Sequence, residues 1–215
     1  MRIDIWSDLV CPWCYVGKRR FEKALVQFDD THPVEIVHHS FQLNPAAPPD
    51  HTSSRREMLM RKYGLSAQQV VAMDARMTHT AAAEDLDFQL EDTLTGNTFD
   101  AHRLVHLARA HGLQNAMVER FYRAYFCEQR SLFDAASLSQ LAVEAGLDRA
   151  EIDTVLQTDR YADAIASDIE AARRLGVNGV PFFVIDSRYG VSGAQPAEMF
   201  LDVLRAAADH QSVGP

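Results

Sequence analysis

The chain has 215 residues, enough for one large domain or for a core with an insertion. Hydrophobic residues make up 47% of it, and no apolar run approaches the ~20 residues that a transmembrane helix needs. A net charge of −9 argues against nucleic acid and anionic membranes as partners, and three cysteines argue against a structural disulfide framework.

The N-terminal segment predicts a β-α-β unit. Residues 2–6 read as a strand, 11–28 as an amphipathic helix and 34–43 as a second strand. A right-handed connection makes the two strands parallel. Because residues 34–43 are apolar on both faces, we expect a central strand of a covered sheet. Met1-Arg2-Ile3-Asp4 lacks a signal-peptide pattern, so, with Met1 as the native start, we expect a cytoplasmic protein.

The middle of the chain predicts helices, and strands return near its end. Apolar periodicity predicts helices over 54–63, 66–84, 98–111, 114–129, 135–145, 148–157 and 160–175. Residues 182–186 and 189–192 then predict a hairpin, and Pro196 opens a final helix. This order indicates an α/β fold in which residues 1–50 and 176–215 form one discontinuous domain and residues 51–175 an all-helical insertion.

A C-x-x-C motif, Cys11-Pro12-Trp13-Cys14, lies between the first strand and the first helix. This layout is typical of a thioredoxin-like redox site. Pro12 suits the first helical turn, and the helix N-terminus favours a thiolate at Cys11. We therefore predict that Cys11 is the nucleophile and Cys14 the resolving thiol. A closed zinc site would need four ligands, and the chain has no second C-x-x-C, so we predict no metal.

Val180-Pro181 follows a glycine-rich stretch and precedes a strand. This position fits a tight turn with a cis peptide bond. A proline there leaves the backbone of Val180 available for pairing with an extended substrate by strand addition. The prediction depends on the C-x-x-C motif upstream.

Other polar and aromatic residues are weaker candidates for a role in the site. Asp8 lies shortly before the motif, at the end of the first strand, and could cap its turn, which we favour, or relay a proton to Cys14. The carboxyl end of the second strand is the sheet edge where α/β proteins bind ligands. Three candidate substrate-binding residues lie near that edge: Phe41, Gln42 and Asn44. A fourth candidate, Asn97, lies just before the helix predicted over 98–111.

Several residues that could bind metal or react are better explained by structure. His102 and His106 share a helix face, but no H-E-x-x-H pattern accompanies them, so we expect a polar helix face. His38 and His39 are expected to be core histidines with satisfied hydrogen bonds. Cys127 is expected to be a small helix-surface or half-buried thiol rather than a third redox partner. The methionines are expected to pack the insertion rather than form a substrate groove: Met58, Met60, Met73 and Met77.

The sequence resembles the FrnE-like branch of the DsbA family along almost its whole length. The motifs that carry the resemblance are Asp8 to Arg19, Phe41-Gln42-Leu43-Asn44-Pro45, Asn97-Thr98, Gly179-Val180-Pro181-Phe182-Phe183 and Val191-Ser192-Gly193-Ala194-Gln195. The resemblance implies a thioredoxin-like fold with a large all-helical insertion, thiol–disulfide exchange at Cys11 and Cys14, a cis-proline loop at Pro181 and a bacterial cytoplasmic setting. Some members carry a second cysteine pair, which this chain lacks.

We therefore predict a DsbA-like thiol–disulfide oxidoreductase acting on protein or small-molecule disulfides and thiols. No tightly bound cofactor is expected beyond the redox-active disulfide, with glutathione as a candidate co-substrate. One alternative is a glutathione-dependent isomerase or transferase of the kappa class, against which the intact Cys11/Cys14 pair weighs. The other is a redox-inert binding protein or chaperone on the same scaffold.

Overall fold

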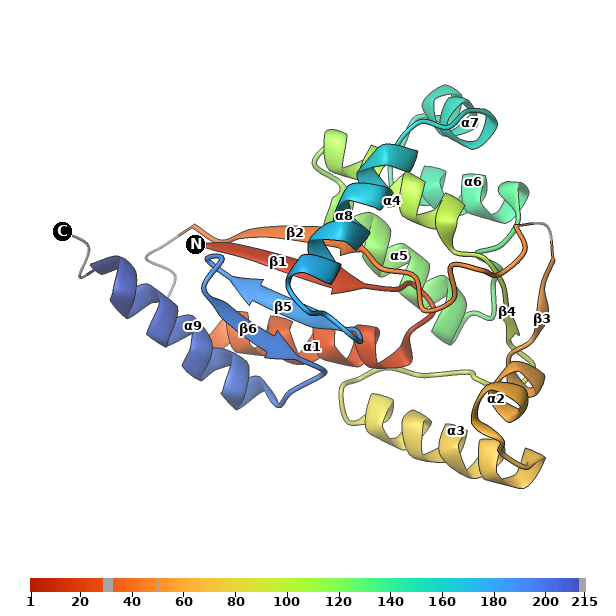
Figure 1. Ribbon diagram of the computed structural model, residues 1–215, viewed down its shortest axis with the longest axis horizontal. Helices are drawn as coiled ribbons and strands as arrows, with labels where there is room; N and C mark the ends of the chain where they lie inside the picture. Colours follow the sequence, from red (N-terminus) through yellow and green to blue (C-terminus); the bar gives the residue numbers. More distant parts are fainter. Residues whose placement is uncertain (29–32, 50, 213–215) are drawn as a thin grey trace.

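The computed structural model describes residues 1–28, 33–49 and 51–212 (Figure 1). Its central sheet has four strands in the order β2-β1-β5-β6. Strand β1 pairs in parallel with β2 and antiparallel with β5, which forms an antiparallel hairpin with β6. The predicted parallel pairing of the first two strands is confirmed. The strand bounds are Arg2–Ser7 for β1, Glu35–Ser40 for β2, Phe182–Ile185 for β5 and Tyr189–Ser192 for β6.

Helix α1 follows β1, helix α9 ends the described chain, and seven helices lie between β2 and β5. Each predicted helix is present within about two residues of its expected ends. The bounds are α1 Pro12–Gln27, α2 Arg55–Tyr63, α3 Ala67–Ala82, α4 Phe99–Ala110, α5 Gln114–Cys127, α6 Ala135–Glu144, α7 Arg149–Gln157, α8 Ala162–Arg174 and α9 Ala197–Ser212. None of these helices is long and apolar enough to cross a membrane.

Two short strands were not predicted. Strand β3 (Ser53–Ser54) pairs antiparallel with β4 (Leu94–Thr95) beside α2. Two residues are too few to show an alternating pattern, so periodicity cannot reveal such strands. In its described residues, the segment between β2 and β5 therefore consists of helices and connecting loops apart from this small ladder.

The sheet is covered on both faces (Figure 1). Helices α1 and α9 pack on one face, where Ile3, Ile5 and Phe183 lie in a common apolar cluster with Phe21 and Phe200. Helix α8 covers the opposite face. Because successive side chains of a strand point to opposite faces, β1 supplies both layers.

The expectation that the second strand is central is wrong, because β2 lies at the edge of the sheet. It is also shorter than the predicted 34–43. Ile36 packs against the apolar cluster of α1 and α9, and the inserted helices α5 and α8 also contact β2. At its outer edge, the side chain of Gln114 accepts from the backbone N–H of His38 and donates to its carbonyl, at 3.0 and 2.8 Å. A glutamine thus occupies hydrogen-bonding positions that another strand would take.

A buried ionic network joins β1 and β2 to α8. His39 contacts Asp168 through Nδ1 at 2.6 Å and Asp4 through Nε2 at 2.7 Å. Burial opposes its charge, but the two carboxylates outweigh burial, and the pKa of His39 is raised. Trp6 stacks on the imidazole with ring centroids 4.5 Å apart. The expectation of a satisfied core histidine is confirmed for His39 but is wrong for His38, whose buried Nδ1 has no hydrogen-bond partner among the described residues.

The histidines of α4 do not form the expected polar face, because both His102 and His106 are buried. His106 Nε2 lies 3.1 Å from both Asp168 Oδ2 and Ser40 Oγ. The acidic partner comes from α8, far along the chain, so spacing within α4 could not identify it. Burial of these histidines ties the insertion to the sheet.

Replacing His39 with Gln should destabilise the protein in a pH-dependent way. A raised pKa means that its contribution is complete below the ordinary value of 6.5 and is lost as the pH rises through the folded-state value. The wild type should exceed His39→Gln in unfolding free energy by about 3 kcal/mol at pH 6. Denaturant titrations from pH 5.5 to 9 should show the difference shrinking above 6.5.

His111→Gln is the matched control. His111 forms a 2.8 Å pair with Glu151, but both side chains are more than a third exposed. Its loss should cost less than about 1 kcal/mol. A His39→Gln deficit that stays constant or grows as the pH rises would contradict the assignment of a charged His39.

Candidate functional site

The C-x-x-C motif lies where β1 ends and α1 begins. Cys11 is the N-cap residue, with φ −91° and ψ 111°, and Pro12 occupies the first helical turn. The Cys14 N–H donates to the Cys11 carbonyl at 3.0 Å and closes the turn. Both cysteines are buried, whereas 46% of Trp13 between them is exposed. The helix position predicted from Pro12 is therefore confirmed.

The two thiols have different surroundings. Burial raises the pKa of the Cys14 thiol well above its ordinary value, and the hydrogen bond and charge of Cys11 raise it further. The backbone of Asp8 hydrogen-bonds to the Cys14 sulfur and opposes this shift. A buried thiol of this kind keeps its proton until a base removes it.

The loop before β5 faces Cys11 from the other end of the chain. The Val180–Pro181 peptide bond is cis. The Cys11 thiol donates to the Val180 carbonyl, with sulfur and oxygen 3.6 Å apart. Helix α1 approaches this loop so closely that a Cβ placed on Gly17 would lie 2.9 Å from Pro181 Cγ. A glycine inside a helix is the one signal in the sequence for this contact.

Asp8 does not cap the turn of its own motif, so the favoured expectation is wrong. No side chain caps α1, and Asp8 Oδ2 instead accepts from the Leu43 N–H at 2.7 Å. Asp8 Oδ1 lies 3.5 Å from His102 Nε2, and each of these buried atoms lacks a hydrogen-bond partner among the described residues. The insertion thus places a histidine beside the carboxylate next to Cys14, which spacing along α4 gave no sign of.

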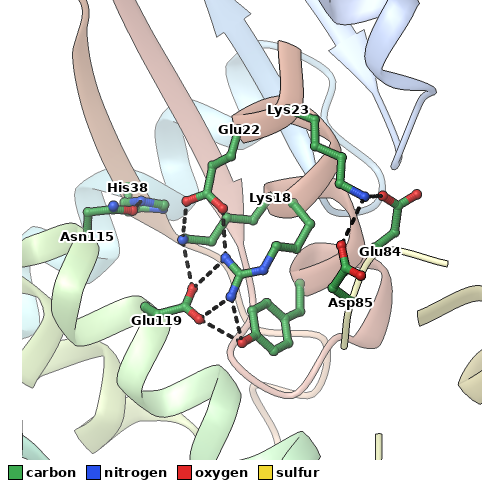
Figure 2. A network of polar contacts seen from close by, with 10 residues as sticks. Lys18, Glu22, Lys23, His38, Glu84, Asp85, Asn115 and Glu119 are labelled. Atoms are coloured by element: carbon green, nitrogen blue, oxygen red, sulfur yellow. Dashed lines mark hydrogen bonds and ion pairs between the residues drawn. The ribbon is translucent and has the colours of Figure 1, made fainter. Parts of the chain in front are cut away.

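A polar cluster fixes α1 against α5 (Figure 2). Glu119 accepts from Lys18 Nζ at 2.8 Å, from the Tyr15 hydroxyl at 2.7 Å and from Arg19. Burial opposes ionisation of Glu119, but Lys18 and Arg19 outweigh it, and the pKa of the carboxyl is lowered to about 2. Figure 2 also shows His38 beside Asn115, where burial and the charge of Lys18 lower the imidazole pKa to about 4.

The four candidate substrate-binding residues do not form one group. Gln42 Nε2 donates to Asn97 Oδ1 at 3.1 Å, and both line a pocket of about 470 Å³ between the proline-rich loop after β2 and the start of α4. Asn97 Oδ1 also accepts from the Phe99 N–H at the start of that helix. Asn44 is exposed in the loop, and Phe41 packs with the cluster of Trp6 beneath α8.

The remaining sulfur residues differ in exposure. Cys127 is half-buried at the end of α5, as predicted, and burial raises the pKa of its thiol. Met77 is buried, whereas Met58, Met60 and Met73 are half-buried. Met73 and Met77 line a second pocket, of about 310 Å³, together with Pro12 and Trp13. The expectation that the methionines only pack the insertion is therefore incomplete.

Comparison with known proteins gives consistent matches. A protein-family model described as the DSBA-like thioredoxin domain matches residues 2–205 of this chain. The crystal structure of a probable DsbA oxidoreductase from Streptomyces coelicolor is 48% identical, with a TM-score of 0.94 over 97% of this chain and 90% of that one. The uncharacterized protein YwbO of Bacillus subtilis (strain 168) is 25% identical over 93% of this chain and 94% of its own.

A cytosolic disulfide reductase, DsbM from Pseudomonas aeruginosa, shares the fold, with a TM-score of 0.66, 19% identity and 98% of each chain covered. The predicted thioredoxin-like fold with a large helical insertion is confirmed, apart from the β3–β4 ladder. Since the family model spans nearly the whole chain, this protein belongs to the family of DSBA-like thioredoxin domains.

Proposed function

We propose that the protein is a thiol–disulfide oxidoreductase that uses Cys11 and Cys14 as a redox-active dithiol. The observation that supports this best is the pairing of two sulfurs at the start of α1, with the Cys11 thiol against the Val180 carbonyl. A substrate sulfur bonded to Cys11 would replace this internal contact. The Val180 backbone would then pair with the extended substrate chain.

Thiol–disulfide exchange proceeds in two steps. The Cys11 thiolate attacks a substrate disulfide, forms a mixed disulfide and releases one substrate thiolate. Cys14 then loses its proton to Asp8 and attacks the Cys11 sulfur. The second substrate thiolate leaves and is protonated. The substrate disulfide gains two electrons, and the enzyme dithiol becomes the Cys11–Cys14 disulfide.

We infer a reductase or isomerase acting on protein or small-molecule disulfides in the cytoplasm, because a reducing compartment keeps such a pair reduced. Glutathione is the candidate co-substrate that would return the oxidised pair to the dithiol. The net charge of −9 favours neither nucleic acid nor anionic membranes as partners. Assignment to the FrnE-like branch remains a prediction.

A redox titration in glutathione buffers tests the proposed function. Trp13 lies between the two cysteines of the motif, so its fluorescence should change when the disulfide forms. We expect one reversible two-electron transition between roughly −120 and −270 mV, with mass spectrometry showing the loss of two hydrogens. Absence of a transition, or only a glutathione adduct on Cys11, would overturn the dithiol proposal.

Cys14→Ser should stop turnover after the first step. Serine cannot resolve the mixed disulfide, so a substrate–Cys11 adduct should accumulate and be visible on a non-reducing gel. Cys11→Ser is the control and should form no adduct. Full survival of a glutathione-linked activity in Cys14→Ser would instead favour the glutathione-dependent isomerase or transferase class.

Asp8→Asn should slow the resolving step on the order of 10²-fold, because an amide keeps the hydrogen bond to Leu43 but takes no proton. The lifetime of the mixed disulfide, measured by acid quench and mass spectrometry, reports this step. The deficit should narrow at high pH, where solvent base removes the Cys14 proton. Asp4→Asn is the control: Asp4 bonds to Arg2 and His39 instead. Equal slowing in both variants would refute the role.

A further inference from the structure

The helical hairpin α2–α3 differs in composition from the rest of the chain. Residues 53–82 hold five Lys or Arg and two Asp or Glu, a net charge of +3 in a chain of −9. Four of the seven methionines also lie in this hairpin. Figure 1 shows α3 beside the N-terminal end of α1, and the two helices are in contact. A basic, methionine-rich element thus adjoins the dithiol turn.

The hairpin and the dithiol turn form the pocket of about 310 Å³, which we call the Trp13 pocket. Pro12 and Trp13 line one side, and Met73 and Met77 line the other. Trp13 is 46% exposed although it is the largest side chain of the motif. Flexible thioethers and an open indole suit apolar side chains of varied shape.

The charges around the Trp13 pocket are unequal. Arg55 Nη1 bonds to Asp74 Oδ1 at 2.8 Å, and both side chains are mostly buried, so this pair neutralises itself. Arg76 also lines the pocket, is exposed, and forms no ion pair within the described part of the chain. The pocket therefore presents one unneutralised cation to a ligand.

We propose that the Trp13 pocket binds the part of a substrate peptide next to its reactive cysteine, and that it prefers an apolar residue accompanied by an acidic one. This inference rests on the proposed function. A substrate sulfur on Cys11 places neighbouring peptide residues within a few ångströms of Trp13, because extended chain advances roughly 3.4 Å per residue. The apolar side chain contacts Trp13 and Met73, and the acidic one pairs with Arg76.

The preference can be measured with chromogenic mixed disulfides of thionitrobenzoate and two cysteine peptides. The peptides carry Phe-Glu or Phe-Lys next to cysteine, and release of thionitrobenzoate gives kcat/KM. The wild type should favour the Glu peptide by about 3-fold, and Arg76→Glu should reverse that ratio. A Gly-Glu peptide should react more slowly than Phe-Glu, and Met73→Thr should reduce this gap.

Arg61→Glu is the matched control, because it makes the same charge change on α2 outside the pocket. It should keep the wild-type ratio. If Arg61→Glu and Arg76→Glu shift the ratio of kcat/KM equally, only the overall electrostatic field of the hairpin acts. That result would overturn the proposed role of the Trp13 pocket. An unchanged ratio in Arg76→Glu would also overturn it.

A small aromatic disulfide without a peptide separates this inference from the proposed function. The wild type and Arg61→Glu should reduce it at equal rates. No reaction of the wild type would overturn the proposed oxidoreductase itself. If the wild type reduces the small disulfide but reacts with all peptides at equal rates, the oxidoreductase proposal holds and the proposed peptide preference of the Trp13 pocket is wrong.

Discussion

The half-buried carboxylate of Glu119 holds the dithiol helix against α5. Lys18 and Arg19 of α1 each pair with both Glu119 and Glu22, and the Tyr15 hydroxyl donates to Glu119. Removing Glu119 would leave the buried Lys18 with Glu22 as its remaining carboxylate partner, and would therefore destabilise the protein. Helix α1 can therefore neither rotate nor slide along α5 without breaking the cluster. The same helix α5 places Tyr122 against Tyr15, with ring centroids 5.0 Å apart, in the apolar cluster that holds both cysteines.

This arrangement makes the insertion part of the redox site. Leu9, Cys11 and Cys14 belong to the same apolar cluster as residues of α3, α4 and α5. The burial that keeps the Cys14 thiol protonated comes from both parts of the chain. On the opposite side of α1, Arg20 donates to Glu84 after α3 and to the Ala194 carbonyl after β6. Three segments far apart in sequence thus meet on one helix.

Local patterns in the sequence were sufficient for most of the fold. The helices of the insertion have clear apolar periodicity and capping residues such as Ser66 and Asp134, so their bounds could be predicted closely. The dithiol turn could also be predicted, because strand, break, cysteines and helix are contiguous. Periodicity fails where partners are distant. Burial of β2 and the charge of His39 both depend on α8, and Asp168 is 129 residues from His39.

The Gln114 side chain has a consequence for association between molecules. An open edge strand is a template on which another chain can add a strand, and long flat edges promote aggregation. Gln114 bonds to the backbone N–H and carbonyl of His38 at the middle of β2, and α5 and α8 both contact the strand. The opposite edge, β6, is only four residues long. Without the insertion this edge of β2 would be open to other copies of the chain, so the insertion also protects the protein against β-sheet polymerisation.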